Sequence, residues 1–458
     1  MSESAISKLT VCRTTLARSK LHSDVLEVLE AGVRAADPES SIRRVITRSE
    51  DGVCVLNECF NTRNRRIHVI GFGKAGQGMS LGCESILGDL VSGGVVIVPS
   101  VDPARTPKRL EVVEGDHPIP REKTLLASRR LVSYVEENLR EGDVVIVLIS
   151  GGGSALFEVP YPPLTLDEVA TTTNILMKAG ADIVELNTVR KHLSLVKGGR
   201  LLEFLRKSYR VFSLIISDVV GDPIEFIASG PTEADTTTYR DVYEVLQRRD
   251  VWNSIPISVR ELVMRGLSGE IPETPKPGDP QLSKVRNIVV SSNIISLLEM
   301  EKKARELGYR TTILTSTMVG EAREVGRFLG GVARHVARYK KPDERVMLLL
   351  GGETTVTVRG RGIGGRNQEL CVGFAISVRG LSNVVLVSAG SDGVDGNSPA
   401  AGGICDGSLV DEALRAGLDP HRYLSNNDTY TLLSKLGRAI VTGPTGTNVN
   451  DLVVLAIE

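Results

Sequence analysis

One stretch constrains this chain more than any other: an apolar run at residues 346–350, followed by a glycine-rich segment at residues 351–369. Five consecutive apolar residues of this kind are typical of a buried parallel strand. Open α/β sheets bind their ligands beyond the carboxyl ends of such strands. The segment carries Glu353 and Arg366, and the predicted helix at residues 368–378 would direct its first N–H groups at an anion. The alternative interpretation is a long connector that needs its glycines only to turn.

A second glycine-rich strand end follows the predicted strand at residues 144–149. Its sequence is Ser150, Gly151, Gly152, Gly153, Ser154. Three glycines between two serines favour a nest of backbone N–H groups for an anion, with hydroxyls beside it. A nucleophilic serine is the competing interpretation, but the G-x-S-x-G spacing of a hydrolase elbow is missing.

A third turn of this kind, at residues 71–78, follows the predicted strand at residues 67–72 and carries Lys74. Its glycines resemble the dinucleotide fingerprint in part, but in that motif backbone amides hold the pyrophosphate without a lysine. We therefore expect the Lys74 side chain to reach a phosphoryl or carboxylate group, the alternative being a solvated surface lysine. A reductase with a nicotinamide site would also use such a turn, yet no acidic residue follows about 20 positions later in a clean second strand.

Two further regions are candidates for holding an acidic substrate. His117 lies in a loop stiffened by two prolines, where it is either a ligand or acid/base group or a structural histidine. Residues 187–200 collect four lysines and arginines, Arg190 among them, and one histidine. Such a run could line a pocket, although a charge run is more often a solvated helical face.

Aspartates follow two more predicted strands. Asp218 comes directly after the strand at residues 210–216, and Asp392 and Asp395 follow the strand at residues 384–389. Carboxylates just past a strand are suitable oxygen ligands for Mg²⁺. The second segment lacks the spacing of an EF-hand calcium loop, so a magnesium or acid/base site fits it better.

The size of the chain indicates two domains. Its 458 residues exceed the roughly 250–300 at which single hydrophobic cores stop growing. Residues 268–282 carry four prolines and no apolar periodicity, which is typical of a linker. We therefore predict an N-terminal Rossmann-like domain at residues 1–275, a linker at residues 276–283 and a second α/β domain at residues 284–458.

Composition excludes several classes of protein. The formal net charge is −1 and basic residues are not segregated, so nothing points to nucleic acid or to an anionic membrane surface. Six scattered cysteines without a CxxC pair argue against a disulfide framework and against a zinc site, and fit a reducing cytosol. There is neither a signal peptide nor a run of 18 apolar residues, so we expect a cytoplasmic protein.

The chemistry-bearing residues point to phosphoryl transfer. Glycine-rich strand ends, a lysine in a turn, an arginine among glycines and aspartates suited to a divalent cation are the parts that this reaction uses. The P-loop and protein-kinase signatures are absent. The residues alone therefore predict a metal-dependent enzyme acting on phosphorylated or carboxylated small molecules.

The chain resembles the family of glycerate 2-kinases whose C-terminal half is called the MOFRL domain. The resemblance rests on segments that run in order through nearly the whole chain: SGGGSAL (150–156), NTVRKHLS (187–194), SDVVGDP (217–223), SGPT (229–232), GGETTV (351–356), GGRNQE (364–369), SAGSDGVDG (388–396) and TGPTGTNVNDL (442–452). It implies two three-layer α/β/α domains with mainly parallel sheets and an active site in the inter-domain cleft. Other relatives of this kind have been labelled hydroxypyruvate reductases.

The resemblance also implies the reaction and its participants. The expected activity is ATP-dependent phosphorylation of D-glycerate at its 2-hydroxyl, giving 2-phosphoglycerate, with Mg²⁺ or another divalent cation. The 2-hydroxyl would attack the γ-phosphoryl in line, helped by an aspartate, while Lys74 and Arg366 neutralise the charge on the transferred group. The oligomeric state is not determined by the sequence, and a homodimer stays open.

Our residue assignments combine the patterns with the resemblance. We expect Lys74, Arg366 and Asp392 to be catalytic, and Asp218 and Asp395 to bind the metal. Lys74, Arg190 and His117 would bind the glycerate. The residues expected to bind ATP are Ser150, Gly151, Gly152, Gly153, Ser154, Gly352, Glu353, Gly364, Gly365 and Asn367.

Overall fold

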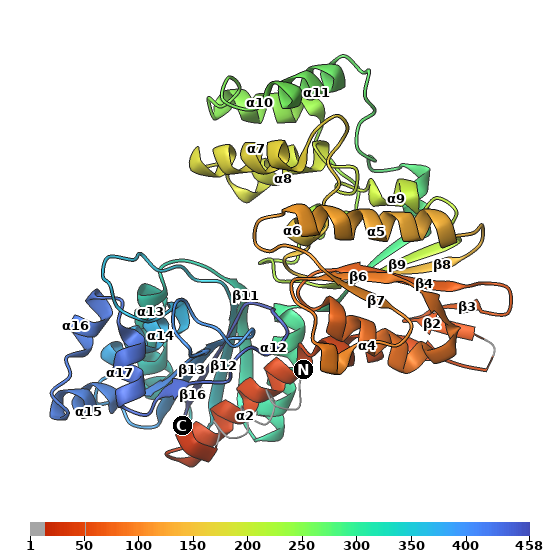
Figure 1. Ribbon diagram of the computed structural model, residues 1–458. Coiled ribbons are helices and arrows are strands. Elements are labelled where there is room, and N and C mark those ends of the chain that lie inside the picture. The colour runs from red at the N-terminus through yellow and green to blue at the C-terminus, as the bar shows by residue number, and fades with distance from the viewer. Residues whose placement is uncertain (1–13, 51) are drawn as a thin grey trace. The chain divides into compact units, whose positions relative to one another are not determined.

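The computed structural model describes residues 14–50 and 52–458 and divides into two compact units (Figure 1). Pro38–Val290 forms one, here called the central unit. Ser291–Glu458, together with the start of the chain up to Asp37, forms the other, here called the terminal unit. This division differs from the predicted domains, because the start of the chain groups with the C-terminal half.

The central unit is built on a sheet of seven strands in the order β10-β9-β8-β4-β6-β7, with β5 paired to β4. The pairs β4–β8, β8–β9, β4–β6, β6–β7 and β4–β5 are parallel. The two strands at the centre, β4 and β8, are buried at every position, as expected for parallel strands covered on both faces. The strands are β4 (Ile67–Phe72), β5 (Val91–Gly93), β6 (Val95–Val98), β7 (Glu111–Glu114), β8 (Val144–Ile149), β9 (Arg210–Ile216) and β10 (Val285–Ser291).

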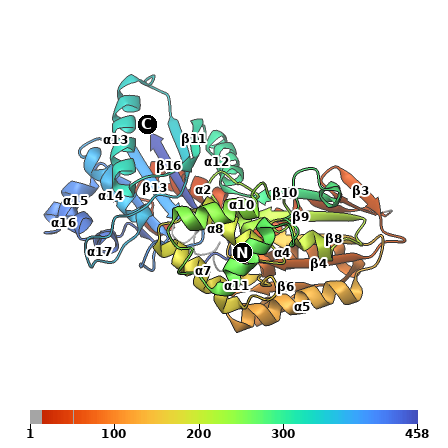
Figure 2. The ribbon, with the colours of Figure 1, turned by 90° about the horizontal axis from the view of Figure 1, so that it is seen from above.

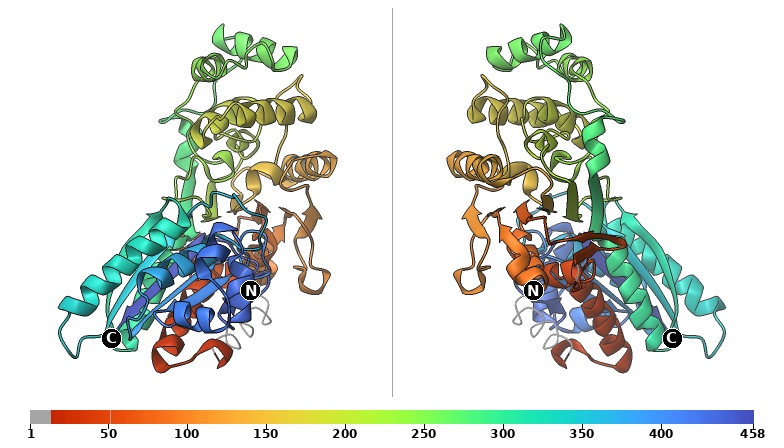
Figure 3. Two further views of the ribbon diagram at one scale, coloured as in Figure 1. Left: turned by 90° about the vertical axis from the view of Figure 1, so that its left-hand side faces the viewer. Right: turned by 90° about the vertical axis from the view of Figure 1, so that its right-hand side faces the viewer.

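Helices cover both faces of this sheet, and four others form a separate layer. Helix α5 packs on one face through Ala127 and Leu131, whereas α4 contacts β4, β6 and β8 from the other. Helices α7, α8, α10 and α11 share their own core, and Figure 3 shows the green pair α10 and α11 beyond the yellow pair α7 and α8. The helices of the central unit are α3 (Pro38–Arg43), α4 (Gly76–Leu87), η1 (Gly88–Leu90), η2 (Pro103–Arg105), α5 (Glu122–Asn138), α6 (Gly153–Leu156), α7 (Leu166–Lys178), α8 (Ile183–His192), α9 (Leu201–Phe204), η3 (Ile227–Ser229), α10 (Tyr239–Arg248), α11 (Ile257–Leu267) and η4 (Pro280–Lys284).

The proline-rich segment predicted as a linker is packed onto the central unit. The N–H of Asp235 donates to the Pro275 carbonyl at 2.9 Å, and the buried Thr274 hydroxyl donates to the Asp235 carboxylate at 2.9 Å. The strand that follows, β10, joins the edge of the central sheet, whereas the sequence placed it at the start of the second domain. Prolines mark this segment because it is irregular, and irregular segments can still be anchored by their hydrogen bonds.

A small antiparallel sheet contains a disulfide that the cysteine spacing did not predict. It consists of β1 (Ile46–Arg48), β2 (Gly52–Val55) and β3 (Glu58–Asn61). Cys54 and Cys59 face each other in the β2–β3 register and are joined. The expectation of fully reduced cysteines fails for this pair, because a tight hairpin places the two thiols opposite each other. Cys83, Cys371 and Cys405 are free and buried, and Cys12 lies outside the described residues.

The sheet of the terminal unit has the order β11-β12-β16-β13-β14-β15. Strands β11 and β12 are parallel, but β16 lies between β12 and β13 and runs antiparallel to both. The α/β class is confirmed, and the mainly parallel pairing expected of both sheets holds for the central one. It is wrong for the terminal sheet, where β14 and β16 pair antiparallel with their neighbours, because a buried apolar run does not specify strand direction. The strands of the terminal sheet are β11 (Arg310–Met318), β12 (Val346–Gly352), β13 (Val384–Gly390), β14 (Gly402–Asp406), β15 (Ala439–Ile440) and β16 (Asp451–Ile457).

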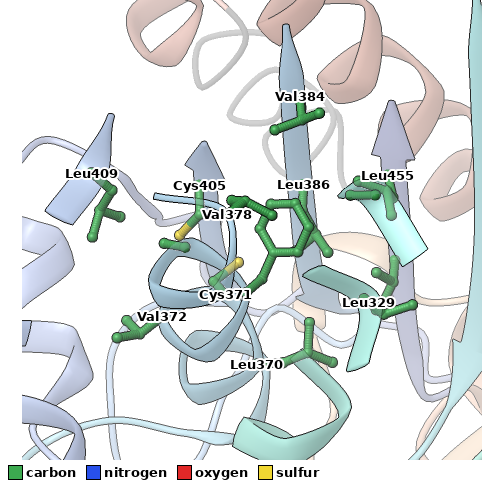
Figure 4. Packing of buried hydrophobic residues seen from close by; sticks show 14 of the residues in the cluster. Leu329, Leu370, Cys371, Val372, Val378, Val384, Leu386, Cys405, Leu409 and Leu455 are labelled. Atoms are coloured by element: carbon green, nitrogen blue, oxygen red, sulfur yellow. The ribbon is translucent and has the colours of Figure 1, made fainter. Parts of the chain in front are cut away.

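Alternation along the buried strands builds two cores, one on each face of the terminal sheet. Leu348 of β12 and Leu455 of β16 face the layer of α13 and α14, where Cys371 and Cys405 also pack (Figure 4). Their neighbours Met347 and Val454 pack in the other core, with residues of α2 and α12. Figure 2 shows these two helices on the side of the sheet away from α13 and α14. Successive side chains of a strand point to opposite faces, so a continuous apolar run supplies both cores. The helices of this unit are α2 (Lys20–Ala35), α12 (Asn293–Glu306), α13 (Ala322–Tyr339), α14 (Arg366–Ser377), α15 (Leu409–Arg415), α16 (Pro420–Ser425) and α17 (Thr429–Lys435).

Helix α2 explains why the start of the chain belongs to the terminal unit. Its apolar face, including Val25 and Leu29, is fully buried in the core beneath β13 and β16. Polar contacts fix it further: Tyr309 donates to Asp24 at 2.9 Å, and His22 lies 2.9 Å from Asp406 of β14. The central unit is therefore inserted between two elements of the terminal unit. No helix in residues 14–50 and 52–458 is long and apolar enough to cross a membrane.

Candidate functional site

Two of the predicted glycine-rich turns lie together in the central unit, because β4 and β8 are parallel neighbours whose carboxyl ends share one edge. The N–H of Lys74 donates to the Gly151 carbonyl at 2.9 Å, and the N–H of Ala75 donates to the Ser150 hydroxyl at 3.0 Å. The approach is so close that a Cβ at Gly73 would lie 2.2 Å from Ser150 Oγ. Ser150 thus holds the lysine turn in place. We call this region, with Lys74, His117, residues 150–154 and Asp218, the β8 site.

Lys74, His117 and Gly152 converge at the β8 site. A Cβ at Gly152 would lie 3.0 Å from the His117 ring and 3.3 Å from Lys74 Cγ, and Gly152 has a φ of +80° that favours glycine. Lys74 is exposed. Burial, assisted by the charge of Lys74, lowers the pKa of His117. Because the N–H groups of Gly151 and Gly152 have no backbone acceptor in the described chain, this turn keeps donors for an anion.

Asp218 lies against the same turn from the end of β9. A Cβ at Gly151 would lie 1.9 Å from its Oδ2 atom, so glycine is needed there to make room for the carboxylate. Asp218 remains partly exposed. The structure therefore brings together four residues that the sequence assigned to three different functions: Lys74, His117, Gly151 and Asp218.

A segment with a strained backbone, at residues 228–229, packs against the β8 site. The sequence did not predict this strain. Ala228 and Ser229 have φ values of +51° and +63°, a conformation that costs non-glycine residues on the order of 1–3 kcal/mol each. The Ser229 hydroxyl is 3.0 Å from the Ser154 hydroxyl, and a Cβ at Gly153 would lie 2.7 Å from Ala228 Cβ. The SGPT motif marks the place, but nothing in the residue types of Ala228 and Ser229 announces their backbone conformation.

The basic run at residues 187–200 is mostly buried and neutralised within the protein. Lys191 Nζ is 3.3 Å from Asp235 Oδ1, and Lys197 Nζ is 2.9 Å from Glu158 Oε2. The run therefore forms neither a solvated helical face nor a pocket lined by all of its cations. Arg190 differs, because it is half-buried and borders an open cavity. Burial lowers the pKa of Arg190, and the nearby Glu158 opposes this effect.

In the terminal unit, Arg366 is held between two carboxylates at the end of β12. Its Nε donates to Asp451 Oδ2 at 2.7 Å and its Nη1 donates to Glu353 Oε1 at 2.8 Å. Burial acts to lower the pKa of Arg366, but Asp451 and then Glu353 outweigh it and raise that pKa. The side chain of Asp451 is almost fully buried, whereas Glu353 is nearly half exposed. We call this region, with Glu353, Gly365, Arg366, Asn367, Asp392, Asp395 and Asp451, the β12 site.

Asp395 occupies the helix start that the sequence assigned to a ligand. Its Oδ1 accepts from the N–H of Asn367 at 3.1 Å, and its Oδ2 accepts from the N–H of Gln368 at 3.0 Å and from the Gln368 amide at 2.9 Å. Burial raises the pKa of Asp395 to about 6, although hydrogen bonds from Gln368 and Asn367 oppose it. A Cβ at Gly365 would lie 2.3 Å from Asp395 Cγ. The carboxylate of Asp395 thus caps α14 and satisfies its first N–H groups.

The remaining predicted residues of the β12 site serve mainly to build it. The Asn367 amide donates to Asp451 Oδ1 at 2.8 Å, and Gly352, with a φ of +143°, passes close to the backbone of Met318. A Cβ at Gly364 would lie 2.4 Å from the Thr429 hydroxyl. Asp392 is partly exposed, and one of its oxygens accepts from the N–H of Val394 at 3.0 Å.

The carboxylates of each unit also bear on the predicted metal. Among residues 14–50 and 52–458 there is no group of three or more His, Cys, Asp or Glu side chains that could hold a metal ion. Magnesium in phosphoryl-transfer enzymes usually takes only one or two protein carboxylates and completes its shell with phosphate oxygens and water. Asp218, a partly exposed carboxylate beside a turn whose Gly151 and Gly152 N–H groups have no backbone acceptor in the described chain, fits that kind of binding.

Comparison with protein families and known structures gives concordant results. Residues 24–264 match a model described as a domain of unknown function, DUF4147, and residues 346–451 match the MOFRL family. A glycerate 2-kinase from Pyrococcus horikoshii is 40% identical over 94% of this chain and 96% of its own length. A D-glycerate 2-kinase from Thermotoga maritima is 39% identical over 94% of this chain and 96% of its own length. The crystal structure of a Thermotoga maritima glycerate kinase superimposes with a TM-score of 0.83 at 38% identity, covering 94% of this chain and 98% of that one.

Proposed function

The chain belongs to the family of glycerate kinases with a MOFRL domain, and we propose that it transfers the γ-phosphoryl group of ATP to the 2-hydroxyl of D-glycerate. That it is a kinase acting on glycerate follows from relatives similar over nearly its whole length. The position of the acceptor hydroxyl and the roles of individual residues are our proposal. The observation that carries it is the β8 site, where Lys74 and His117 converge with the N–H groups of Gly151 and Gly152, which have no backbone acceptor in the described chain, beside the Asp218 carboxylate.

The β8 site is suited to the phosphates of ATP. The N–H groups of Gly151 and Gly152 would donate to phosphate oxygens, and Lys74 would add a mobile positive charge. Phosphoryl transfer depends mostly on positioning and on neutralising the phosphate charge, which these groups supply without covalent chemistry. Gly153 and Ser154 shape the turn, because Ser154 is tied to Ser229 and Gly153 packs on Ala228.

A divalent cation fits the same chemistry. Bound with ATP, it would neutralise phosphate charge during transfer. Asp218 is the carboxylate of the β8 site that would help to hold it, and Asp395 is the second candidate from the sequence. In the terminal unit, the partly exposed Asp392 would orient the substrate hydroxyl or accept its proton.

Arg366 would bind an anionic group through the part of its guanidinium that remains open. Two of its nitrogens, Nε and Nη1, are engaged by Asp451 and Glu353, whereas Nη2 has no acceptor among the described residues. Asp451 would therefore act as a positioning residue that fixes the plane of the guanidinium. His117, through a ring N–H, and Arg190, through its positive charge, would help to bind the glycerate carboxylate.

The experiment that tests the proposal is ³¹P NMR of the purified protein with D-glycerate and Mg·ATP, with an EDTA control. We expect ADP and a phosphomonoester resonance that matches 2-phosphoglycerate, both abolished by EDTA. A 3-phosphoglycerate signal would leave the kinase in place and refute the 2-hydroxyl as acceptor. No phosphoryl transfer, with oxidation of NADH in the presence of hydroxypyruvate, would refute the kinase and favour the reductase.

A further inference from the structure

A cavity of the central unit adjoins the β8 site, and most of its walls have no part in the reaction described above. Its volume is about 410 Å³, and it is bordered by the loop after His117, by the turn at residues 150–156 and by one face of α7. Gly152 and Ser154 belong both to this cavity and to the phosphate nest. We call it the α7 cavity. A molecule seated in it could therefore extend directly into the nest.

The walls of the α7 cavity expose large apolar side chains. Ile119 is 55% exposed and Met177 is 50% exposed, and both line the cavity. Val169 and Ala170 add further apolar surface from the same helix. Apolar side chains that border a concave, otherwise polar site are typical of ligand pockets, because the ligand removes their surface from water.

A buried polar atom in the same wall has no partner. Glu158 is only 2% exposed and lines the cavity. Its Oε2 is bound by Lys197, but its Oε1 has no hydrogen-bond donor in the structure. A buried carboxylate oxygen without a donor is costly, so a ligand that supplies an N–H or O–H group would be favoured there. Arg190 also borders the cavity and adds a positive charge near its rim.

These features do not suit glycerate. That substrate is a three-carbon acid with an oxygen on every carbon, so it offers no apolar surface to Ile119 or Met177. A cavity of about 410 Å³ is within the range of roughly 300–1,000 Å³ that holds drug-sized or nucleotide-sized ligands. A nucleoside combines a flat apolar base with N–H and O–H donors, and its phosphates extend from one side.

We propose that the α7 cavity binds the base and sugar of the nucleotide, so that ATP is bound by the central unit with its phosphates in the β8 nest. This inference rests on the proposed kinase function and adds the location of the nucleoside to it. The base packs between Ile119 and Met177, and Glu158 Oε1 accepts a hydrogen bond from the nucleoside. Ile119 and Met177 then contribute to affinity for nucleotides and not to affinity for inorganic polyphosphate.

The test compares binding of ADP and of tripolyphosphate, measured by isothermal titration calorimetry in the absence of glycerate. The variants are Met177→Ala, which removes the apolar wall, and Ala170→Phe, which fills the cavity. Met264→Ala on α11 is the matched control, because Met264 is also 50% exposed but does not line the cavity. Met177 and Met264 are both surface residues, so their substitution leaves the core intact.

We expect Met177→Ala to weaken ADP binding at least fivefold, Ala170→Phe to weaken it more, and both to leave tripolyphosphate binding within twofold of the wild type. Met264→Ala should change neither ligand. Equal ADP affinity in the wild type and both cavity variants would overturn the inference, and so would equal losses for ADP and tripolyphosphate. The kinase assay separates the two proposals: phosphoryl transfer at an unchanged KM for ATP in Ala170→Phe refutes the cavity alone, whereas absence of transfer in the wild type refutes the function.

Discussion

The β8 site and the β12 site both consist of a glycine-rich segment after a buried strand, yet the protein fills them differently. At the β12 site, Asp395 caps the start of α14, and Asp451 and Glu353 neutralise Arg366. At the β8 site, Lys74 is exposed, and the N–H groups of Gly151 and Gly152 have no backbone acceptor in the described chain. The protein's own carboxylates occupy the arginine and the helix start of the β12 site, whereas at the β8 site Asp218 lies beside the turn and Lys74 stays exposed.

This difference shows what glycine after a strand does and does not indicate. Gly365 is required because the Asp395 carboxylate lies where a Cβ would be, so it serves the packing of the protein. Gly152 is required by its positive φ and by the approach of His117, on a surface that stays open. Glycine indicates close approach to a backbone in both places, and only the charges nearby tell whether the approaching group is a ligand.

We expect the largest effect on activity from substitution of Lys74, the cation of the β8 site. We expect Lys74→Met to lower kcat about 100- to 1,000-fold, because one donor to developing phosphate charge is worth ~3–4 kcal/mol in such a site. Steady-state kinetics with glycerate and Mg·ATP measure it. Lys123→Met is the control, since Lys123 is exposed and paired only with Glu114 at 3.5 Å. A Lys74→Met enzyme within threefold of the wild type would contradict the role of Lys74.

Substitutions at the β12 site should lower the stability of the protein more than substitutions at the β8 site. Asp451→Ala leaves Arg366 Nε and the Asn367 amide without their buried acceptor, so we expect a loss of about 3 kcal/mol in the free energy of unfolding. Lys74→Met should change that free energy by less than about 0.5 kcal/mol, as is usual for exposed side chains. Urea unfolding followed by circular dichroism measures both. Equal losses in the two variants would remove the distinction between the sites.

Substitution of Gly365 and of Gly152 compares the β12 site with the β8 site, with smaller expected effects on stability and on the KM for ATP. Gly365→Ala should cost about 1–3 kcal/mol of stability, because its Cβ meets the Asp395 backbone and carboxyl group. Gly152→Ala should cost about 1 kcal/mol through its positive φ and should also raise the KM for ATP several-fold. Thermal unfolding and kinetics on the same preparations test this. If Gly365→Ala raised the KM for ATP with no loss of stability, the β12 site would be the open one.

The smallest effect concerns protonation at the open site. The pKa of His117 lies below its usual value near 6.5, so the free protein carries this histidine neutral at pH 7. An anion bound nearby favours the protonated ring, so ADP or tripolyphosphate should shift the His117 pKa upward. By linkage, the anion binds more tightly as the pH falls through that pKa. NMR titration of the ring protons, assigned with His117→Asn, would show no shift if the anion binds elsewhere.

Periodicity was sufficient to predict most strands and their class. The runs at residues 67–72, 144–149 and 210–216 coincide with β4, β8 and β9, because strands buried on both faces are continuous in apolar residues. The direction of β16 was not predictable in this way, since an apolar run reads the same in a parallel and an antiparallel strand. The hairpin of β2 and β3 was missed, because each of its strands is only four residues long and shows no extended apolar run.

The sequence was sufficient to predict the residue types of the candidate site, but only some of the contacts between those residues. Lys74, His117 and the glycines at 151 and 152 lie together because parallel strands end at a common edge. Asp395 lies in a loop without regular structure and caps α14 through Asn367 and Gln368, which are 28 and 27 positions away in the sequence. No local sequence pattern encodes that contact. The same holds for Glu158, whose partner Lys197 is brought to it by the tertiary fold.

The packing of α2 beneath the C-terminal sheet has a consequence for biosynthesis. Because the ribosome releases α2 long before β12, β13 and β16, the helix must wait with its apolar face unpaired while the whole central unit is made. The central unit can fold first, as N-terminal domains generally do, but the terminal unit can close only when translation is complete. A fragment that begins at Ser291 would keep α12 but expose the part of this sheet face that α2 covers, and adding α2 as a separate peptide should cover it again.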